Sequence, residues 1–204
     1  MLAVIAVTGI LLVAGVRLLG DTAAQARRAA TDTVTGLIEQ ARTTAITTRS
    51  HVILAIAEPG DLPTSDNRCR LGLFKVDDWP EDSTGEMPAV QLNRWRVLDI
   101  GVVLAAGEDN GQSNGPLPNP IDAPELRIRY GSGANARTVK VHALSFNPRG
   151  GLRFPEGSSP VQLRIAEGGY RNGVAMPVRR GEASGVAENR LKIGRVIARP
   201  YRTN

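Results

Sequence analysis

Few side chains of this 204-residue chain have the types and spacing that catalysis requires. Cys69 is its single cysteine and lies between Arg68 and Arg70, whose charges favour a lowered thiol pKa. The two histidines, His51 and His142, are not near it in the sequence. We therefore expect a structural or incidental thiol rather than a nucleophile. One cysteine also excludes an internal disulfide and a cysteine-based zinc site.

Two further segments carry weak signals for ligand binding. Residues 77–82 include Asp77, Asp78, Glu81 and Asp82, whose carboxylates could hold calcium, but their spacing is not that of an EF-hand, and a solvated loop is expected. Residues 131–136 (GSGANA) begin like a dinucleotide-binding turn but lack its last glycine and a following helix, which predicts a hairpin turn. We therefore predict no catalytic residue, no cofactor, no metal and no small-molecule substrate.

The last fifteen residues are basic and contain no acid. In a strand, Arg195 and Arg199 would share one face and could contact phosphates together with Arg202. The alternative is that these arginines only solvate the surface or pair with acids of a neighbouring subunit. The chain has 22 arginines against 3 lysines, so a single arginine carries little information.

Charge is unevenly distributed along the chain. The formal net charge is +5, and 42% of the residues are apolar, as in a folded protein. Residues 1–50 carry five basic and three acidic groups, residues 51–126 carry five and thirteen, and residues 127–204 carry fifteen and four. Oppositely charged regions suit a subunit that stacks against neighbours, because complementary patches steer association.

The chain begins with an uncharged apolar run over residues 1–16, slightly shorter than the roughly 20 residues that span a membrane. A cleaved signal peptide and a buried core helix are alternatives, but the run lacks a basic start and is apolar on every side. We expect a membrane helix without its first few residues. The side chains expected to serve membrane insertion and assembly are Leu2, Val4, Ile5, Val7, Ile10, Leu11, Leu12 and Val13.

The helical pattern continues beyond this run. Apolar residues recur at three- and four-residue steps, and no proline occurs before Pro59, so one helix is predicted from Met1 to about Thr47. Its apolar face is expected to pack on a sheet through Ala30, Val34, Leu37, Ile38 and Ala41. We assign residues 1–22 to a transmembrane half of the helix and residues 23–50 to an amphipathic half.

From residue 51 onward, short apolar or alternating runs are separated by glycine and proline turns, which predicts strands. The expected strands lie within residues 52–57, 70–76, 90–106, 125–130, 138–146, 151–154, 161–166, 173–177 and 191–198, with loops over 77–89 and 107–124. Residues 51–204 are therefore expected to form one antiparallel β domain. The predicted fold class is α+β, with a long N-terminal helix packed on this domain.

The beginning of the chain, MLAVIAVTGILL, resembles the apolar run that opens the helix of type IV pilin-like proteins. The basic leader, processing glycine and glutamate of that family are missing, and we expect the upstream DNA to encode them in frame. The C-terminal half is similar to GspH/FimT-type minor pseudopilins, with an F-x-P-x-G turn and a G-R-V element. The matching residues are Phe146, Pro148, Gly150, Gly194 and Arg195.

In the first of these motifs, Gly150 and Gly151 are expected to supply positive φ angles for a chain reversal. The resemblance covers the first 57 residues and residues 140–200, and we can name no family that residues 58–139 match.

The resemblance implies a minor pseudopilin of a type II secretion or type IV pilus-like system, which acts by assembly and is no enzyme. Its partners would be other pilin-like subunits and the inner membrane, crossed once, with the β domain in the periplasm or in an extracellular filament. The alternative is a FimT-like subunit that binds DNA for uptake. The DNA signature of that branch is G-R-x-R, but here Ile197 replaces the second arginine.

Overall fold

The computed structural model describes residues 2–64, 66–79, 86–106, 126–178 and 186–203, and for residues 2–21, 105, 106, 134 and 174 it describes the backbone alone. The elements are α1 (Leu2–Thr48), β1 (His51–Ala57), β2 (Arg70–Val76), β3 (Glu86–Pro88), β4 (Val90–Gln91), β5 (Arg96–Val97), β6 (Val102–Ala106), β7 (Leu126–Tyr130), the 3₁₀ turn η1 (Gly133–Asn135), β8 (Arg137–Phe146), β9 (Leu152–Phe154), β10 (Val161–Arg171), β11 (Val174–Pro177), β12 (Glu188–Ile193) and β13 (Pro200–Thr203).

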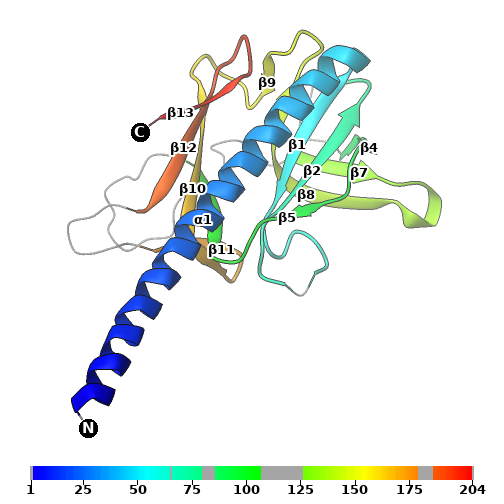
Figure 1. Ribbon diagram of the computed structural model, residues 1–204. Helices are drawn as coiled ribbons and strands as arrows, with labels where there is room; N and C mark the ends of the chain where they lie inside the picture. The colour runs from blue at the N-terminus through cyan, green and yellow to red at the C-terminus, as the bar shows by residue number, and fades with distance from the viewer. Residues whose placement is uncertain (1, 65, 80–85, 107–125, 179–185, 204) are drawn as a thin grey trace.

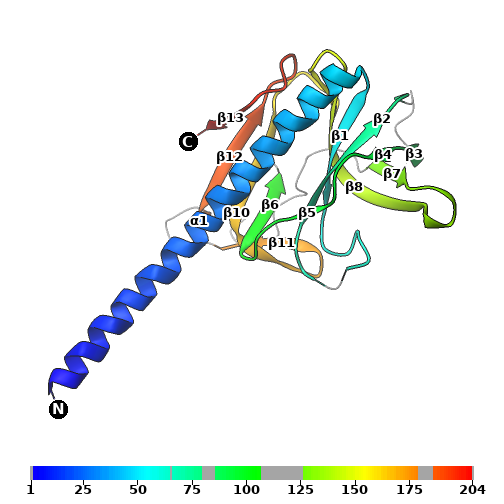
Figure 2. The ribbon, with the colours of Figure 1, turned by 45° about the vertical axis from the view of Figure 1, so that its right-hand side comes forward.

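Helix α1 is continuous over 47 residues. It contains no proline, and each of its glycines costs a helix only about 1 kcal/mol relative to alanine. Arg49 then takes a left-handed φ of 52°, which ends the helix and turns the chain into β1. Figures 1 and 2 show the first half of α1 extending away from the strands and the second half lying across them.

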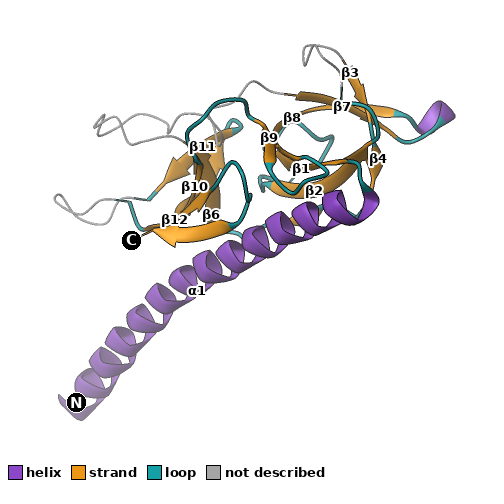
Figure 3. Cartoon of the chain, turned by 90° about the horizontal axis from the view of Figure 1, so that it is seen from above, coloured by secondary structure: helices purple, strands orange, loops and turns teal. Residues whose placement is uncertain are grey.

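The first sheet follows the order β3-β7-β8-β1-β2-β4, with β5 and β9 attached to β2 and β8. Seen from above, this sheet curls around on itself (Figure 3). One face of it lines an interior that contains Ile53, Phe74, Met87, Ile128 and Val141, all buried. Trp79 and Trp95 pack against the same cluster, as anchors of the loops in which they lie.

The second sheet follows the order β11-β10-β12-β13, and β6 also pairs with β10. Leu163 and Ile165 of β10 share a core cluster with Leu37 of the helix. The outer face of the first sheet contributes Leu54 and Leu144 to the same cluster. The second half of α1 therefore covers both sheets and buries one common core.

The predicted α+β, pilin-like fold is confirmed. Strands β1 and β2 match the predicted runs closely because both are bounded by turn residues. One strand pair departs from the antiparallel expectation, since β3 is parallel to β7 within a segment we predicted as a loop. The predicted strand over 191–198 is wrong beyond Ile193, where the backbone leaves the ladder before β13 begins. The predicted loop over 107–124 lies outside the described residues.

Within the part of the chain whose side chains are described, no helix is sufficiently long and apolar to cross a membrane. The residues assigned to membrane insertion and assembly, Leu2 to Val13, lie in the segment whose backbone alone is described. The division of α1 into residues 1–22 and 23–50 stays a prediction.

Candidate assembly interface

The apolar face of α1 is the central feature of the candidate interface. Its residues recur every three or four positions, so they lie on one side of the helix. All five side chains predicted to pack on a sheet are buried, between 0% and 3% exposed, and Ala45 extends the face. The face consists of Ala30, Val34, Leu37, Ile38, Ala41 and Ala45. Burying each large side chain contributes about 1.5–3 kcal/mol, so this half of the helix is held firmly on the sheets.

A buried ion pair fastens the start of this half. Arg27 Nη1 lies 2.7 Å from Glu167 Oε1 in β10, and the side chains are 17% and 6% exposed. Because few charged groups are buried without a partner, this pair fixes the depth and rotation of α1 against the second sheet.

Two more polar contacts follow within a turn and a half of the helix. Asn189 Nδ2 in β12 donates to Thr31 Oγ1 at 2.8 Å, and Thr31 donates in turn to the Arg27 carbonyl oxygen at 2.8 Å. Arg202 in β13 pairs with Asp32, with both side chains largely exposed. The three strands β10, β12 and β13 thus each contact α1 within residues 27–32. These three contacts are called the polar ties below.

The opposite side of α1 is open. Most of the exposed residues there are polar or small and lie about half a helical turn away from the apolar face: Gln25, Arg28, Ala29, Gly36, Gln40 and Thr43. A Cβ added at Gly36 would meet no atom within 4 Å. Helix α1 therefore presents a free face, along which another helix could pack.

The F-x-P-x-G motif forms a turn after β8. Phe146 is fully buried in the core at the end of the strand. Asn147 Oδ1 accepts hydrogen bonds from the amides of Arg149 at 2.9 Å and Gly151 at 3.0 Å, which closes the turn around the half-buried Pro148. Gly150 has φ +80°, as expected. Gly151 does not, contrary to our prediction.

Gly151 instead permits a close backbone approach to the G-R-V segment. A Cβ at Gly151 would lie 3.1 Å from the carbonyl oxygens of Arg195 and Val196. The Leu152 amide donates to the Arg195 carbonyl at 2.8 Å, and the Ala198 amide donates to the Gly150 carbonyl at 3.1 Å. The two motifs, about 45 residues apart in the sequence, thus form one structural unit.

The three candidate DNA-binding arginines point to different partners. Arg195 donates to backbone carbonyl oxygens of Ser159 at 2.5 Å, of Glu156 at 3.5 Å and of Pro155, and burial lowers its pKa. Arg202 pairs with Asp32 on the helix, and Arg199 is exposed. Because the strand ends at Ile193, Arg195 and Arg199 do not share a strand face. No observation in the described residues favours DNA binding over assembly.

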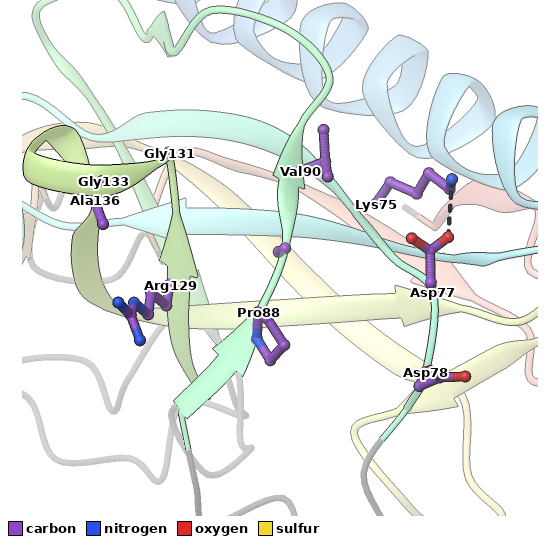
Figure 4. Close-up of a pocket in the computed structure, with 10 residues that line it drawn as sticks. Lys75, Asp77, Asp78, Pro88, Val90, Arg129, Gly131, Gly133 and Ala136 are labelled. Atoms are coloured by element: carbon purple, nitrogen blue, oxygen red, sulfur yellow. Dashed lines mark ion pairs between the residues drawn. The ribbon is translucent and has the colours of Figure 1, made fainter.

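The hollow shown in Figure 4 contains the first part of the acidic segment. Its volume is 380 Å³, and Asp77, Asp78, Lys75 and Arg129 are among the residues that line it. Lys75 Nζ lies 2.8 Å from Asp77 Oδ1, and this hydrogen bond lowers the pKa of Asp77. The hollow is therefore lined by acidic and basic side chains together.

Glu81 and Asp82, the other two residues of the acidic segment, lie outside the described residues. Over the described ranges, no group of three or more metal-ligating side chains is close enough to hold a metal ion.

Cys69 is a poor nucleophile in this structure. It is 1% exposed, and burial raises the pKa of its thiol to about 12. Its contacts are with the core of the domain, and Tyr170 provides a hydrogen bond that opposes the shift. Despite its two flanking arginines, the thiol is therefore protonated at neutral pH.

His51 has a packing role at the junction between helix and strand. Its ring centroid lies 5.5 Å from that of Trp79. Burial, and then the charge of Arg153, lowers the pKa of His51, so the neutral ring is favoured.

Sequence reasoning missed the polar residues that meet the helix and one buried ion pair. Arg164 is 1% exposed, and its Nε lies 2.6 Å from Oε2 of Glu188, whose other oxygen pairs with Arg190 at 2.6 Å. One signal in the sequence points to these pairs, namely the small number of acids in the C-terminal part of the chain. Residues 127–204 contain four acids against fifteen bases, and Glu167 and Glu188 are two of those four. Isolated acids in a basic segment are candidates for internal pairing.

A long helix whose second half packs across antiparallel and mixed sheets, with one side left free, defines a pilin-like subunit. Residues 30–180 match the family model of the type II transport protein GspH, and the chain belongs to this family. The match also covers residues 58–139, for which we found no resemblance in the sequence. The Gly194-Arg195 element lies beyond the matched residues. No curated protein and no solved structure matches the chain.

Proposed function

We propose that this chain is a minor pseudopilin, a structural subunit that joins other pilin-like subunits in a filament of a type II secretion or type IV pilus-like system. The GspH family comprises structural subunits of type II transport rather than enzymes. The observation that carries the proposal is that the two faces of α1 differ. One face is buried on the subunit's own sheets, and the opposite face, which includes Gly36 and Gln40, is exposed.

The proposed location is the inner membrane, with the first part of α1 as a single anchor and the β domain in the periplasm or in an extracellular filament. The uncharged run over residues 1–16 supports an apolar environment for that part of the helix. The continuous backbone of α1 supports a direct connection between anchor and domain. The proposed partners are other pilin-like subunits, and no reaction or small-molecule substrate is assigned.

Cysteine cross-linking tests this proposal with little background, because Cys69 is buried and its thiol pKa is about 12. A cysteine is introduced at the exposed helix position in Gly36→Cys, and the matched control is Thr138→Cys, which is exposed on β8 away from the helix. A maleimide–benzophenone reagent of short reach is added to cells that produce the full chain and its pilin-like partners. Its maleimide reacts with the introduced thiol, and on irradiation its benzophenone inserts into a C–H bond of the neighbouring chain. We expect cross-linked products with pilin-like subunits from Gly36→Cys alone. The proposal fails if both variants give the same products, or if the helix position gives none.

A further inference from the structure

Three segments that are distant in the sequence meet at the end of the molecule where α1 terminates. Figures 1 and 2 both show the segment between β12 and β13 at the same end of the molecule as the last turn of α1. The turn after β8 connects them, because the Ala198 amide donates to Gly150 and a Cβ at Gly150 would lie 2.8 Å from Ile46 Cδ1. Ile46 belongs to the helix, so all three segments contribute to one surface.

The centre of this surface is apolar and unusually exposed. Val196 is 84% exposed, Ile197 is 58% exposed and Ile46 is 40% exposed. The chain on both sides of Val196 and Ile197 is pinned, since Arg195 is hydrogen-bonded through its guanidinium and carbonyl groups and Ala198 is fully buried. The two apolar side chains are therefore held outward by fixed neighbours. Clustered exposed apolar side chains on a fixed framework are typical of interaction sites.

The rim of the surface is positively charged. Arg49 follows the end of α1, Arg149 precedes Gly150, and Arg199 follows Ala198, and all three are exposed. None of the three forms an ion pair with any residue in the described ranges. We call Ile46, Val196, Ile197 and these three arginines the cap surface.

Acids on neighbouring segments pair with other bases. Glu39 pairs with Arg42 at 3.6 Å, and Glu156 pairs with Arg153 at 3.8 Å. Asp77, which also contacts Ser50 beside Arg49, pairs with Lys75 at 2.8 Å. The charges of the rim thus remain available to a partner.

We propose that the cap surface binds an acidic segment with apolar side chains, contributed by a neighbouring pilin-like subunit. Charge complementarity selects the carboxylates, which pair with the three arginines at the rim. The apolar centre selects a protein partner over a nucleic acid, because phosphates and sugars gain nothing from Val196 and Ile197, which would lie at the middle of the contact. The partner's identity as a pilin-like subunit rests on the proposed function; the surface and its chemistry rest on the contacts above.

Photo-cross-linking in the full chain tests this inference. Benzoylphenylalanine is placed at position 197, and the matched control carries it at position 90, where Val90 is 59% exposed on β4. The cells contain the pilin-like partners, and the cross-linked peptide is identified by mass spectrometry. A second set combines position 197 with Arg49→Gln, Arg149→Gln and Arg199→Gln, substitutions of exposed side chains that leave the core unchanged.

We expect a pilin-like chain to be cross-linked at position 197 and not at position 90, through a segment rich in Asp, Glu and apolar residues. The three glutamines should lower the yield about tenfold, since exposed ion pairs contribute modestly and their effects sum over three side chains. Three outcomes would overturn the inference. They are a cross-link to nucleic acid or lipid, the same products at both positions, and a yield at position 197 that the three glutamine substitutions leave unchanged. If the Gly36→Cys products form while position 197 gives none, the cap surface proposal alone fails; if neither forms, the proposed function fails as well.

Discussion

The Arg27–Glu167 ion pair should contribute more to stability than any exposed pair that holds the same helix. Replacing Arg27 with Met keeps most of the side-chain volume but removes the guanidinium that lies 2.7 Å from the carboxylate of Glu167, which is 6% exposed. A carboxylate in that position must either remain charged in a dry environment or be protonated, and both cost free energy. The Asp32–Arg202 pair provides a natural comparison, because it joins the same helix to the same sheet with side chains that are 69% and 55% exposed.

The magnitude follows from burial. Removing one partner of a buried ion pair typically costs about 3–5 kcal/mol. We expect the Arg27→Met variant to lose about 3 kcal/mol of its free energy of unfolding, the low end of this range. The reason is that Arg27 is 17% exposed and Glu167 has a further interaction within the protein. Asp32→Asn should lose at most about 1 kcal/mol. The double variant Arg27→Met with Glu167→Gln should recover part of the loss, because the buried carboxylate charge is then removed as well.

Urea unfolding of the full chain in detergent, followed by circular dichroism, measures these free energies. The comparison is made at low salt and at 1 M salt. We expect the small Asp32→Asn effect to disappear at high salt, because exposed charges are screened, and the Arg27→Met effect to persist. The reasoning is refuted if Arg27→Met costs no more than Asp32→Asn, or if salt removes both effects equally.

Three other outcomes follow from the same structure. With its thiol pKa raised to about 12 by burial, Cys69 should resist maleimide at pH 8 in the folded protein and react fully in urea, as mass spectrometry would show. Gly150→Ala should lower the free energy of unfolding by about 1–2 kcal/mol, because Gly150 has a left-handed φ of +80°. Gly36→Ala should raise the free energy of unfolding by up to about 1 kcal/mol, because the added Cβ meets no atom within 4 Å and alanine favours the helix. Thermal unfolding measures both changes. Burial lowers the pKa of His51 from 6.5, so the unfolded chain binds its proton first and stability should fall as pH drops below 6.5; His51→Gln should reduce this slope in denaturation curves at pH 7 and pH 5.

Much of the fold follows from local sequence pattern. The helix was predictable to its last turn, since the apolar period of Ala30 to Ala45 is sustained and no proline interrupts it. Strands β1 and β2 were predictable because short apolar runs lie between turn residues. These signals depend on neighbours in the chain, which a single sequence contains in full.

Contacts between distant residues were not predictable in this way. Arg27 and Glu167 are 140 positions apart, and nothing near either residue indicates the other. The parallel pairing of β3 with β7 is likewise set by how the sheet closes and not by the three residues of β3. The end of β12 at Ile193 was missed because the residues after it bond to segments far away in the sequence. The Arg195 side chain donates to Ser159, and the Arg195 carbonyl accepts from the Leu152 amide.

For the candidate interface, the apolar face of α1 and the two C-terminal motifs were identified from the sequence, but their mutual arrangement was not. The F-x-P-x-G and G-R-V elements were matched as separate marks of a family. In the structure they form one unit through Gly150, Gly151 and Ala198. The exposure of Val196 and Ile197 is a property of that unit, because a regular strand would have buried one of them.

Because α1 is one continuous helix, a rotation of the β domain also moves the N-terminal end of the helix. At 1.5 Å per residue the helix is roughly 70 Å long, and roughly half of that length lies beyond the polar ties. A rotation of about 10° of the β domain would therefore move the far end of the helix by about 6 Å, more than the rise of one helical turn. Small rearrangements among the outer domains would be enlarged at the N-terminus, and the position of that end would in turn constrain the angle of the domain. In an assembly, the continuous helix would therefore couple the positions of the N-terminal ends to the orientations of the β domains.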